Sequence, residues 1–157
     1  MRYVALLRGI MPMNPNMRGE KLREVFESLK FTNVHTVIAS GNVVFDSPSK
    51  SAAALEKKIE DALPKQLKFT STTMVRSQKE IELLVKKNPF KGVKDEKPNY
   101  LLVTFFKDHR KELCSVIDVT SSDSPKFMSD LEKKYSKAIT SRTWKTVHRI
   151  LKKMHEE

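Results

Sequence analysis

The chain has 157 residues, with 30 Lys and Arg against 19 Asp and Glu, which gives a net charge of +11. Hydrophobic residues make up 39% and charged residues 31%, so the composition excludes a disordered chain and a membrane span. We expect one compact, soluble domain over residues 1–157, with sub-domains at 1–76 and 77–157. Because no cleavage site follows the apolar start and Cys114 is the single cysteine, we expect a cytoplasmic protein without disulfides.

The excess of basic residues attracts anions and favours phosphate-bearing ligands or nucleic acid as partners. Many lysines, however, alternate with glutamates in helical stretches such as residues 20–30 and 54–65. That pattern is typical of a solvated helix face. The charge therefore leaves a small anionic ligand and a nucleic acid both open, and it indicates no membrane partner.

An apolar run followed by a helical repeat predicts a strand and then a helix at the start of the chain. Residues Arg2–Leu7 are almost wholly apolar, as in a strand buried on both faces. A loop over residues 10–18 follows. The helix is then predicted by apolar residues at i, i+3, i+4 and i+7, namely Leu22, Val25, Phe26 and Leu29.

Two β-branched runs over residues 34–39 and 42–46 come next. They are joined through Ser40-Gly41, where glycine can take positive φ, and this predicts a hairpin. A second helix is predicted from Leu55, Ile59 and Leu63, which share one helical face, and we expect Pro64 to end it. Residues 69–75, rich in threonine, are predicted to form a fourth strand.

The resulting βαββαβ order matches the split βαβ motif. We therefore predict an α+β fold (α/β plait) with a ferredoxin-like N-terminal half, in which the first and third strands are central. In the second half, Ser77–Glu80 is a capping box that begins a helix ending at Asn88-Pro89. Further predicted elements are strands over 100–106 and 115–120, a helix from Ser124-Pro125, and a last helix over 143–154.

Three motifs are specific enough to compare with known families: Leu6–Ile10 (LLRGI), Ser40–Phe45 (SGNVVF) and Thr140–Val147 (TSRTWKTV). Together they resemble the bacterial family catalogued as domain of unknown function 1697, and the resemblance spans most of the chain. It implies two ferredoxin-like halves in a bacterial cytoplasmic protein, and it implies no particular reaction.

The chain departs from the pattern of that family at three places. The loop after Ile10 carries Met11–Pro15 where the family has glycines, and the closing Arg-Asn-Trp is Arg142-Thr143-Trp144. The stretch over residues 126–137 is short and lacks the glycine and the strand that the family places there. The second ferredoxin-like half is therefore expected to be degenerate.

The predicted strand directions bring two motifs together. In a split βαβ sheet the third strand returns between the first and second, so the end of the first strand meets the turn before the third. Arg8 and Gly9 follow the first strand, and Ser40, Gly41 and Asn42 form that turn. An arginine fork beside exposed turn amides predicts an anion or carboxylate pocket. The alternative is that the turn residues only complete the hairpin and that Arg8 pairs with a surface acid.

The last predicted helix offers a further positive group. It carries Trp144 on an apolar stripe and lysines on the opposite face. We expect Thr140 or Ser141 to cap this helix, and Arg142 adds charge to a helix start that already favours anions. The sequence thus predicts that Arg142 and Trp144 join Arg8 at one ligand-binding rim.

Several kinds of chemistry are not indicated by the sequence. No phosphate-binding glycine loop is present, and the four histidines lack metal-ligand spacing, so neither a cofactor nor a metal is predicted. The leading hypothesis is a binding module for a small anionic ligand. One alternative is an enzyme acting on a small phosphorylated or carboxylated metabolite, for which no proton-transfer group is identified. The other is nucleic-acid binding through the basic last helix.

Overall fold

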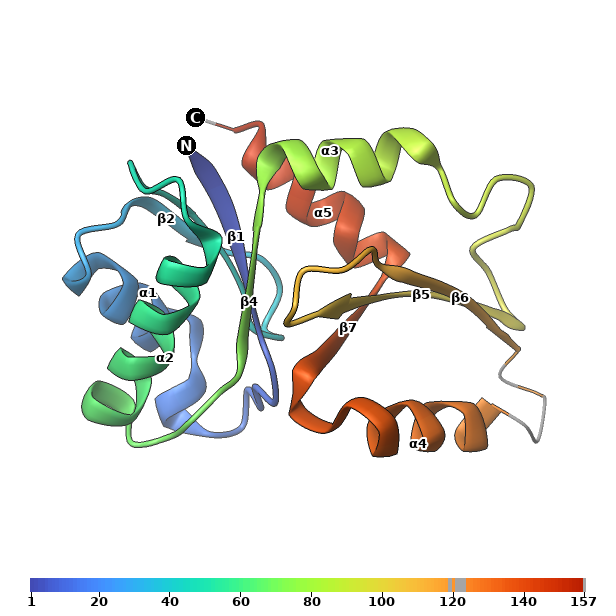
Figure 1. Cartoon of the computed structure of the whole chain (residues 1–157), viewed down its shortest axis with the longest axis horizontal. Helices are drawn as coiled ribbons and strands as arrows, with labels where there is room; N and C mark the ends of the chain where they lie inside the picture. Colours follow the sequence, from blue (N-terminus) through green and yellow to red (C-terminus); the bar gives the residue numbers. More distant parts are fainter. Residues whose placement is uncertain (119, 121–123, 157) are drawn as a thin grey trace.

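The computed structural model of the chain describes residues 1–118, 120 and 124–156. The described residues form two antiparallel sheets and five α-helices, a mixed α+β structure (Figure 1). The helices are α1 (Gly19–Ser28), α2 (Ala52–Leu67), α3 (Gln78–Lys87), α4 (Ser124–Tyr135) and α5 (Trp144–Met154). Two short 3-10 helices are η1 (Pro15–Met17) and η2 (Ser136–Ala138). Among the described residues, no helix is long and apolar enough to cross a membrane.

The first sheet has four strands in the order β2-β3-β1-β4. They are β1 (Arg2–Leu7), β2 (Thr32–Thr36), β3 (Asn42–Asp46) and β4 (Thr73–Ser77). The bounds of β1 and β3 are those predicted, and these two strands are the central ones, as the sequence indicated. Tyr3 lies opposite Phe45 and Leu6 opposite Asn42, so the end of β1 lies beside the start of β3.

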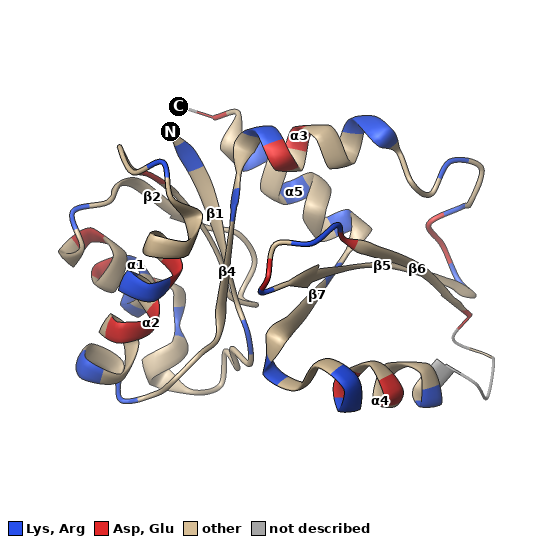
Figure 2. Cartoon of the chain, in the orientation of Figure 1, with Lys and Arg blue, Asp and Glu red and all other residues tan. Residues whose placement is uncertain are grey.

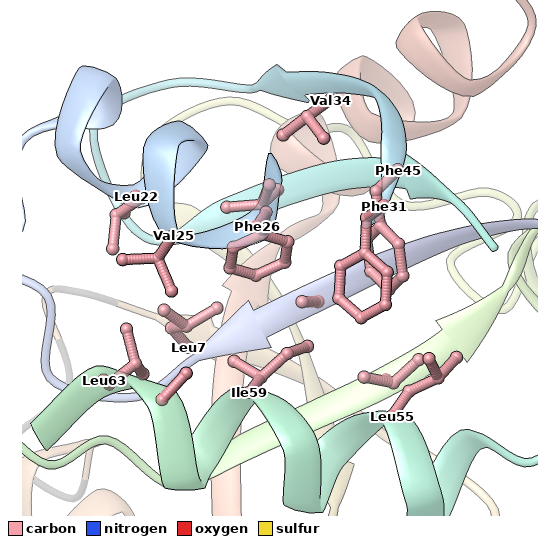
Figure 3. Packing of buried hydrophobic residues seen from close by; sticks show 14 of the residues in the cluster. Leu7, Leu22, Val25, Phe26, Phe31, Val34, Phe45, Leu55, Ile59 and Leu63 are labelled. Atoms are coloured by element: carbon pink, nitrogen blue, oxygen red, sulfur yellow. The ribbon is translucent and has the colours of Figure 1, made fainter. Parts of the chain in front are cut away.

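The first strand is apolar throughout because both faces of its sheet are covered. Tyr3, Ala5 and Leu7 pack with residues of α1 and α2 in one core, which Figure 3 shows from close by. Val4 and Leu6 point to the opposite face, into a second core that contains residues of α3 and α5. Each face of β1 is thus buried by a different pair of helices.

The second sheet has three strands in the order β6-β5-β7, which are β5 (Asn99–Phe106), β6 (Leu113–Asp118) and β7 (Ile139–Thr143). Leu101, Val103 and Phe105 of β5 belong to the second core, together with Val4 and Leu6 of β1. This core therefore joins the two sheets. Helix α4 lies on the other side of the second sheet from α3 and α5 (Figure 1).

Helix α2 does not end at Pro64, as the sequence predicted, but continues to Leu67. A proline removes one backbone hydrogen bond, yet contacts elsewhere hold the last turn. Leu67 is buried, and its carbonyl accepts a 3.2 Å hydrogen bond from Asn16 Nδ2. Lys68 caps the helix after Leu67: it has φ 63° and donates its N–H to the Pro64 carbonyl.

Three strands are displaced from their predicted ranges. Strand β2 ends at Thr36 because the chain turns over residues 37–41, where the Val37 N–H bonds to the Asn42 carbonyl. Strand β4 begins at Thr73, since residues 69–72 carry the chain from α2 back to the sheet. Strand β6 covers residues 113–118, and position 119 of its predicted range lies outside the described residues.

The stretch before α5 is a strand, which the sequence did not predict. Ile139, Thr140 and Arg142 are buried in β7, which pairs with β5. The helix is capped by Thr143, whose Oγ1 accepts the Thr146 N–H at 3.2 Å, and neither Thr140 nor Ser141 caps it. Pairing with β5 thus removes both expected caps. The capping box of α3, by contrast, is present as predicted.

Candidate functional site

The end of β1 and the turn before β3 lie together, and Arg142 of β7 reaches them both. The Leu7 N–H bonds to the Gly41 carbonyl at 2.8 Å. Arg142 donates from Nε to Asn42 Oδ1 at 2.6 Å and from Nη2 to the Leu7 carbonyl at 2.9 Å. The juxtaposition that was predicted from strand directions is therefore present, and it includes a side chain from the second half of the protein.

The guanidinium of Arg142 is fully occupied by the protein itself. Its Nη1 donates to Thr140 Oγ1 and the Ser141 carbonyl, and its Nη2 donates to Gly41 O besides Leu7 O. An arginine has five N–H donors, and each of them has an acceptor here. Burial lowers the pKa of Arg142 to about 10, and no carboxylate among the described residues pairs with it. Arg142 is therefore a cross-link between β7, β1 and the turn, with no donor left for a ligand.

The polar groups of the turn residues also bond to the protein itself and complete the hairpin. Asn42 is buried and its Nδ2 donates to the Val37 carbonyl and to Ser40 Oγ, both at 3.0 Å. Gly41 has φ 83°, and a Cβ there would lie 2.7 Å from Ile10 Cγ1 and 2.8 Å from the Leu7 carbonyl oxygen. Only glycine fits this turn without displacing β1.

Trp144 lies in the second core. The indole is 6% exposed and its ring packs edge-on against Phe90, with centroids 5.2 Å apart, and against His148 at 4.7 Å. Arg142 and Trp144 are thus near in sequence but point to different environments. The structure does not bring Trp144 to the rim at which the sequence predicted it.

Arg8 points away from the turn toward the second half. Its Nη1 and Nη2 form a fork with the Glu132 carboxylate of α4 at 3.2 and 2.7 Å, and Nη1 also donates to the Ile139 carbonyl at 2.9 Å. Nε and one N–H of Nη2 have no partner among the described residues. The side chain is 29% exposed, so part of it is accessible to a ligand.

A polar pocket of about 430 Å³ adjoins Arg8. The first half supplies most of its walls and η2 of the second half supplies Lys137. The lining residues are Arg8, Gly9, Glu60, Thr70, Ser71, Thr72 and Lys137. Figure 2 shows Lys and Arg on both sides of the junction between the two sheets. Of the predicted site residues, only Arg8 and Gly9 line this pocket.

Backbone contacts fix the position of Arg8 at the pocket. Its N–H donates to the Thr72 carbonyl at 3.0 Å, and its carbonyl accepts from Ser71 Oγ at 2.7 Å. Gly9 follows with φ 76°, and no atom lies within 4 Å of the place of a Cβ. Lys137 is exposed and forms no ion pair with any described residue. The pocket therefore contains one cationic group that hydrogen bonds hold in place, Arg8, and a second, Lys137, without an ion-pair partner in the described part of the chain.

A buried charged cluster joins the two halves beside the pocket, and it was not predicted. Glu56 of α2 is 2% exposed, and its Oε2 accepts from the Val75 N–H at 2.8 Å. The same oxygen lies 2.9 Å from His109 Nε2 and 3.9 Å from Arg76 Nη1. Lys107 Nζ lies 3.5 Å from Glu56 Oε1. One carboxylate thus faces three basic side chains.

The hydrogen bonds of this cluster determine the tautomer of His109. Arg76 Nη1 lies 3.3 Å from His109 Nδ1, and since a guanidinium only donates, Nδ1 is the acceptor. His109 then donates from Nε2 to Glu56. Burial lowers the pKa of Arg76, and the nearby Glu80 and Glu56 carboxylates oppose that shift. A sequence signal for the cluster existed, because Glu56 shares the apolar face of α2 with Ile59.

Metal and thiol chemistry find little support in the structure. Among residues 1–118, 120 and 124–156, no group of three or more His, Cys, Asp or Glu side chains could hold a metal ion. Burial and the Glu112 carboxylate raise the pKa of the Cys114 thiol. A thiol with a raised pKa is a weak nucleophile at neutral pH.

The architecture is that of a mixed α+β protein with two antiparallel sheets. The chain belongs to the family described as Protein of unknown function (DUF1697), which matches residues 1–135. The resemblance that was drawn from the sequence motifs is thereby confirmed. The matched region contains Arg8 and the turn at residues 40–42, and it ends before β7.

One solved structure has the same fold over nearly the whole chain. It is that of a conserved bacterial protein, SP0830 from Streptococcus pneumoniae. The two chains are 20% identical, the alignment covers 98% of each, and the TM-score is 0.75. None of the curated proteins matches the chain. The comparisons therefore indicate a family and a fold, and they support no specific function.

Proposed function

We propose that the chain binds a small anionic ligand in the junction pocket, with Arg8 and Lys137 as its cationic groups. The observation that carries the proposal is that two N–H donors of Arg8 have no partner in the described part of the chain and that Arg8 lines a cavity of about 430 Å³. That volume falls within the roughly 300–1,000 Å³ of small-molecule sites. A guanidinium held in a fixed orientation is suited to carboxylate or phosphate groups.

The proposal keeps part of the rim that was predicted from the sequence. Arg8 and Gly9 remain, because both line the pocket. Arg142 and the turn at residues 40–42 are left out, because their polar groups bond to one another and to β1. Trp144 is left out because it packs in the second core.

Binding is favoured over catalysis by the groups that face the pocket. Its lining has no histidine, cysteine or tyrosine. Glu60 is the one lining carboxylate, and its Oε2 already accepts from the Thr73 N–H at 3.0 Å and from Lys107 Nζ at 2.9 Å. These two bonds occupy both lone pairs of Oε2, so this oxygen is engaged by the protein itself. The enzyme alternative would have to rely on this group.

The nucleic-acid alternative has weaker support. The polar face of α5 carries Lys145, Arg149, Lys152 and Lys153, but Lys153 pairs with Glu156 at 2.8 Å. In Figure 2 acidic and basic residues are interspersed over α1, α2, α3 and α4, whereas α5 carries no Asp or Glu. A polyanion requires several adjacent phosphate contacts, which give a steep dependence of affinity on salt. A single pocket predicts a shallow dependence of affinity on salt.

We further propose a ferredoxin-like topology for the first half and a degenerate version for the second. The strand order β2-β3-β1-β4 with α1 and α2 on one face supports the former. The three-stranded order β6-β5-β7 supports a departure from it in the second half. The single, free cysteine supports a cytoplasmic location.

Thermal unfolding in the presence of anions tests the binding proposal. Sodium phosphate and sodium acetate should raise the Tm of the chain above its value in sodium chloride of equal ionic strength, because a ligand of the folded state stabilises it by mass action. Lys137→Gln should reduce this increase at least by half and leave the Tm without anion unchanged. The matched control is Lys145→Gln, in which an exposed lysine of α5 is replaced.

Two outcomes would contradict the proposal. One is an equal Tm in phosphate, acetate and chloride. The other is an increase that Lys145→Gln reduces as much as Lys137→Gln does, since that result would reflect net charge alone. A short single-stranded RNA that binds tightly, with an affinity that falls steeply with salt, would favour the nucleic-acid alternative.

A further inference from the structure

The lining of the junction pocket lacks the groups that hold a planar ring. None of its seven residues is aromatic or a large aliphatic: they are Arg8, Gly9, Glu60, Thr70, Ser71, Thr72 and Lys137. Nucleobases and aromatic acids are recognised mainly by stacking on such side chains. The pocket therefore offers no surface for the apolar part of a nucleotide or an aromatic carboxylate.

Several groups of the same lining are available for hydrogen bonds to the hydroxyl groups of a ligand. Glu60 Oε2 is engaged by Lys107 and the Thr73 N–H, but Glu60 Oε1 has no partner among the described residues. The hydroxyls of Thr70 and Thr72 likewise make no hydrogen bond within the described part of the chain. A carboxylate oxygen accepts from a ligand hydroxyl, and a threonine hydroxyl both donates and accepts.

The size of the pocket also exceeds the needs of a simple anion. One water molecule takes up roughly 30 Å³ in the liquid. A phosphate ion has only five non-hydrogen atoms, so it fills only part of the pocket. The cavity measures about 430 Å³. The lining of the remaining volume includes polar groups, and a ligand that occupies it must satisfy them or leave them hydrated.

We propose that the ligand is a polyhydroxylated anion, that is, a sugar phosphate or a sugar acid. This inference rests on the proposed function, because the anionic group is assigned to Arg8 and Lys137. The hydroxyl groups then bond to Glu60 Oε1, Thr70 and Thr72. Because Lys137 belongs to η2 and the other groups belong to the first half, the ligand bridges the two halves.

Isothermal titration of the full chain with a small set of probes tests this ligand class. Glucose 6-phosphate and gluconate are the two polyhydroxylated anions, and inorganic phosphate, acetate, glucose and AMP are the comparisons. At least one polyhydroxylated anion should bind tenfold or more tightly than the simple anion with the same charged group. AMP should bind no more tightly than phosphate. Glucose should bind more weakly than either polyhydroxylated anion.

A variant separates the hydroxyl contacts from the anion contacts. Thr72→Val removes one hydroxyl at nearly constant volume and should weaken the better polyhydroxylated anion about fivefold, and it should weaken phosphate by a smaller factor. Thr32→Val, on the exposed part of β2, is the matched control and should change neither affinity. Both variants should unfold at the temperature of the wild type.

The outcomes distinguish this inference from the proposed function. If phosphate binds but the sugar part adds no affinity, the ligand class is wrong and the anion site stands. If AMP binds more tightly than glucose 6-phosphate, the ligand class is again wrong. If no anion binds at all, the proposed function fails and this inference fails with it.

Discussion

Arg142 Nε donates a 2.6 Å hydrogen bond to Asn42 Oδ1, and the two residues are 100 positions apart in the chain. Together with the bonds from Nη2 to Leu7 and Gly41, this contact ties β7 to the end of β1. The cation is buried among neutral acceptors, so its contribution comes from the geometry of its donors. The residue that was expected to bind a ligand instead fixes the arrangement of the strands beside the pocket.

Arg142→Lys should destabilise the fold although it conserves the charge. An ammonium group has three donors in place of five, so at least two of the buried acceptors lose their partner. We expect the free energy of unfolding in urea to fall by about 3 kcal/mol, at a cost of about 1–3 kcal/mol for each unsatisfied group. Arg149→Lys, at an exposed position of α5, should change it by less than about 0.5 kcal/mol. Equal stability of the two variants would contradict the role assigned to Arg142.

Gly41→Ala should cost more than Gly92→Ala, although both glycines have φ 83°. Both substitutions force a side chain into the left-handed region, at about 1 kcal/mol. Only at Gly41 does the new Cβ meet atoms, namely Ile10 Cγ1 and the Leu7 carbonyl oxygen, and Gly92 has nothing within 4 Å. We expect a loss of about 3 kcal/mol for Gly41→Ala in urea unfolding. A similar loss for both variants would show that the turn is not packed against β1.

Glu56→Gln should weaken the junction between the two halves. The change removes the negative charge that faces Arg76, Lys107 and His109, and it leaves the buried Arg76 without its nearest carboxylate. Loss of one partner of a buried ion pair costs about 3 kcal/mol. Asp61→Asn on the same helix removes an exposed partner of Lys57 and should cost less than about 1 kcal/mol. If chemical denaturation gives the same midpoint for both variants, the buried cluster does not stabilise the protein.

The Cys114 thiol should react slowly in the folded protein. Its pKa is raised by burial and by Glu112, so less of it is thiolate at pH 8 than in the unfolded chain. Alkylation by iodoacetamide should therefore be slower in buffer than in urea, where the pKa returns to about 8.5. As pH increases, the rate in the folded state should rise with a midpoint above that value. A faster reaction in buffer than in urea would show an activated thiol.

The sequence predicted best those elements whose surroundings are the same on both faces. β1 is buried on both sides, so its apolar run has clear ends, and β3 begins directly after a turn that needs Gly41. β7 was missed because Thr-Ser-Arg-Thr is also typical of a helix start. Pro64 was expected to end α2, but the last turn is in contact with Asn16 of η1, which is 51 positions from Leu67 in the chain.

The sequence predicted which strand ends meet beside the candidate site, but it did not predict most of the residues that line the pocket. Strand directions brought the end of β1 and the turn to one end of the sheet, and Arg142 was expected there as part of a helix start, whereas it reaches the turn from β7. Two facts decide which arginine faces the pocket: Arg142 lies in a strand, and Glu132 of α4 draws Arg8 toward the second half. Neither can be read from residue types or spacing. The buried cluster around Glu56 shows the same limit, since it joins side chains from three separate segments.

Chemical-shift mapping with inorganic phosphate tests the central claim most directly. Titration of the ¹⁵N-labelled chain at constant ionic strength should move the amide signals of Gly9, Ser71, Thr72 and Lys137 most, because these residues line the pocket. The signals of Gly41 and Asn42 should move less. Shifts that are largest along α5 at Lys145 and Arg149, or no shifts beyond those given by chloride, would contradict an anion site at the junction.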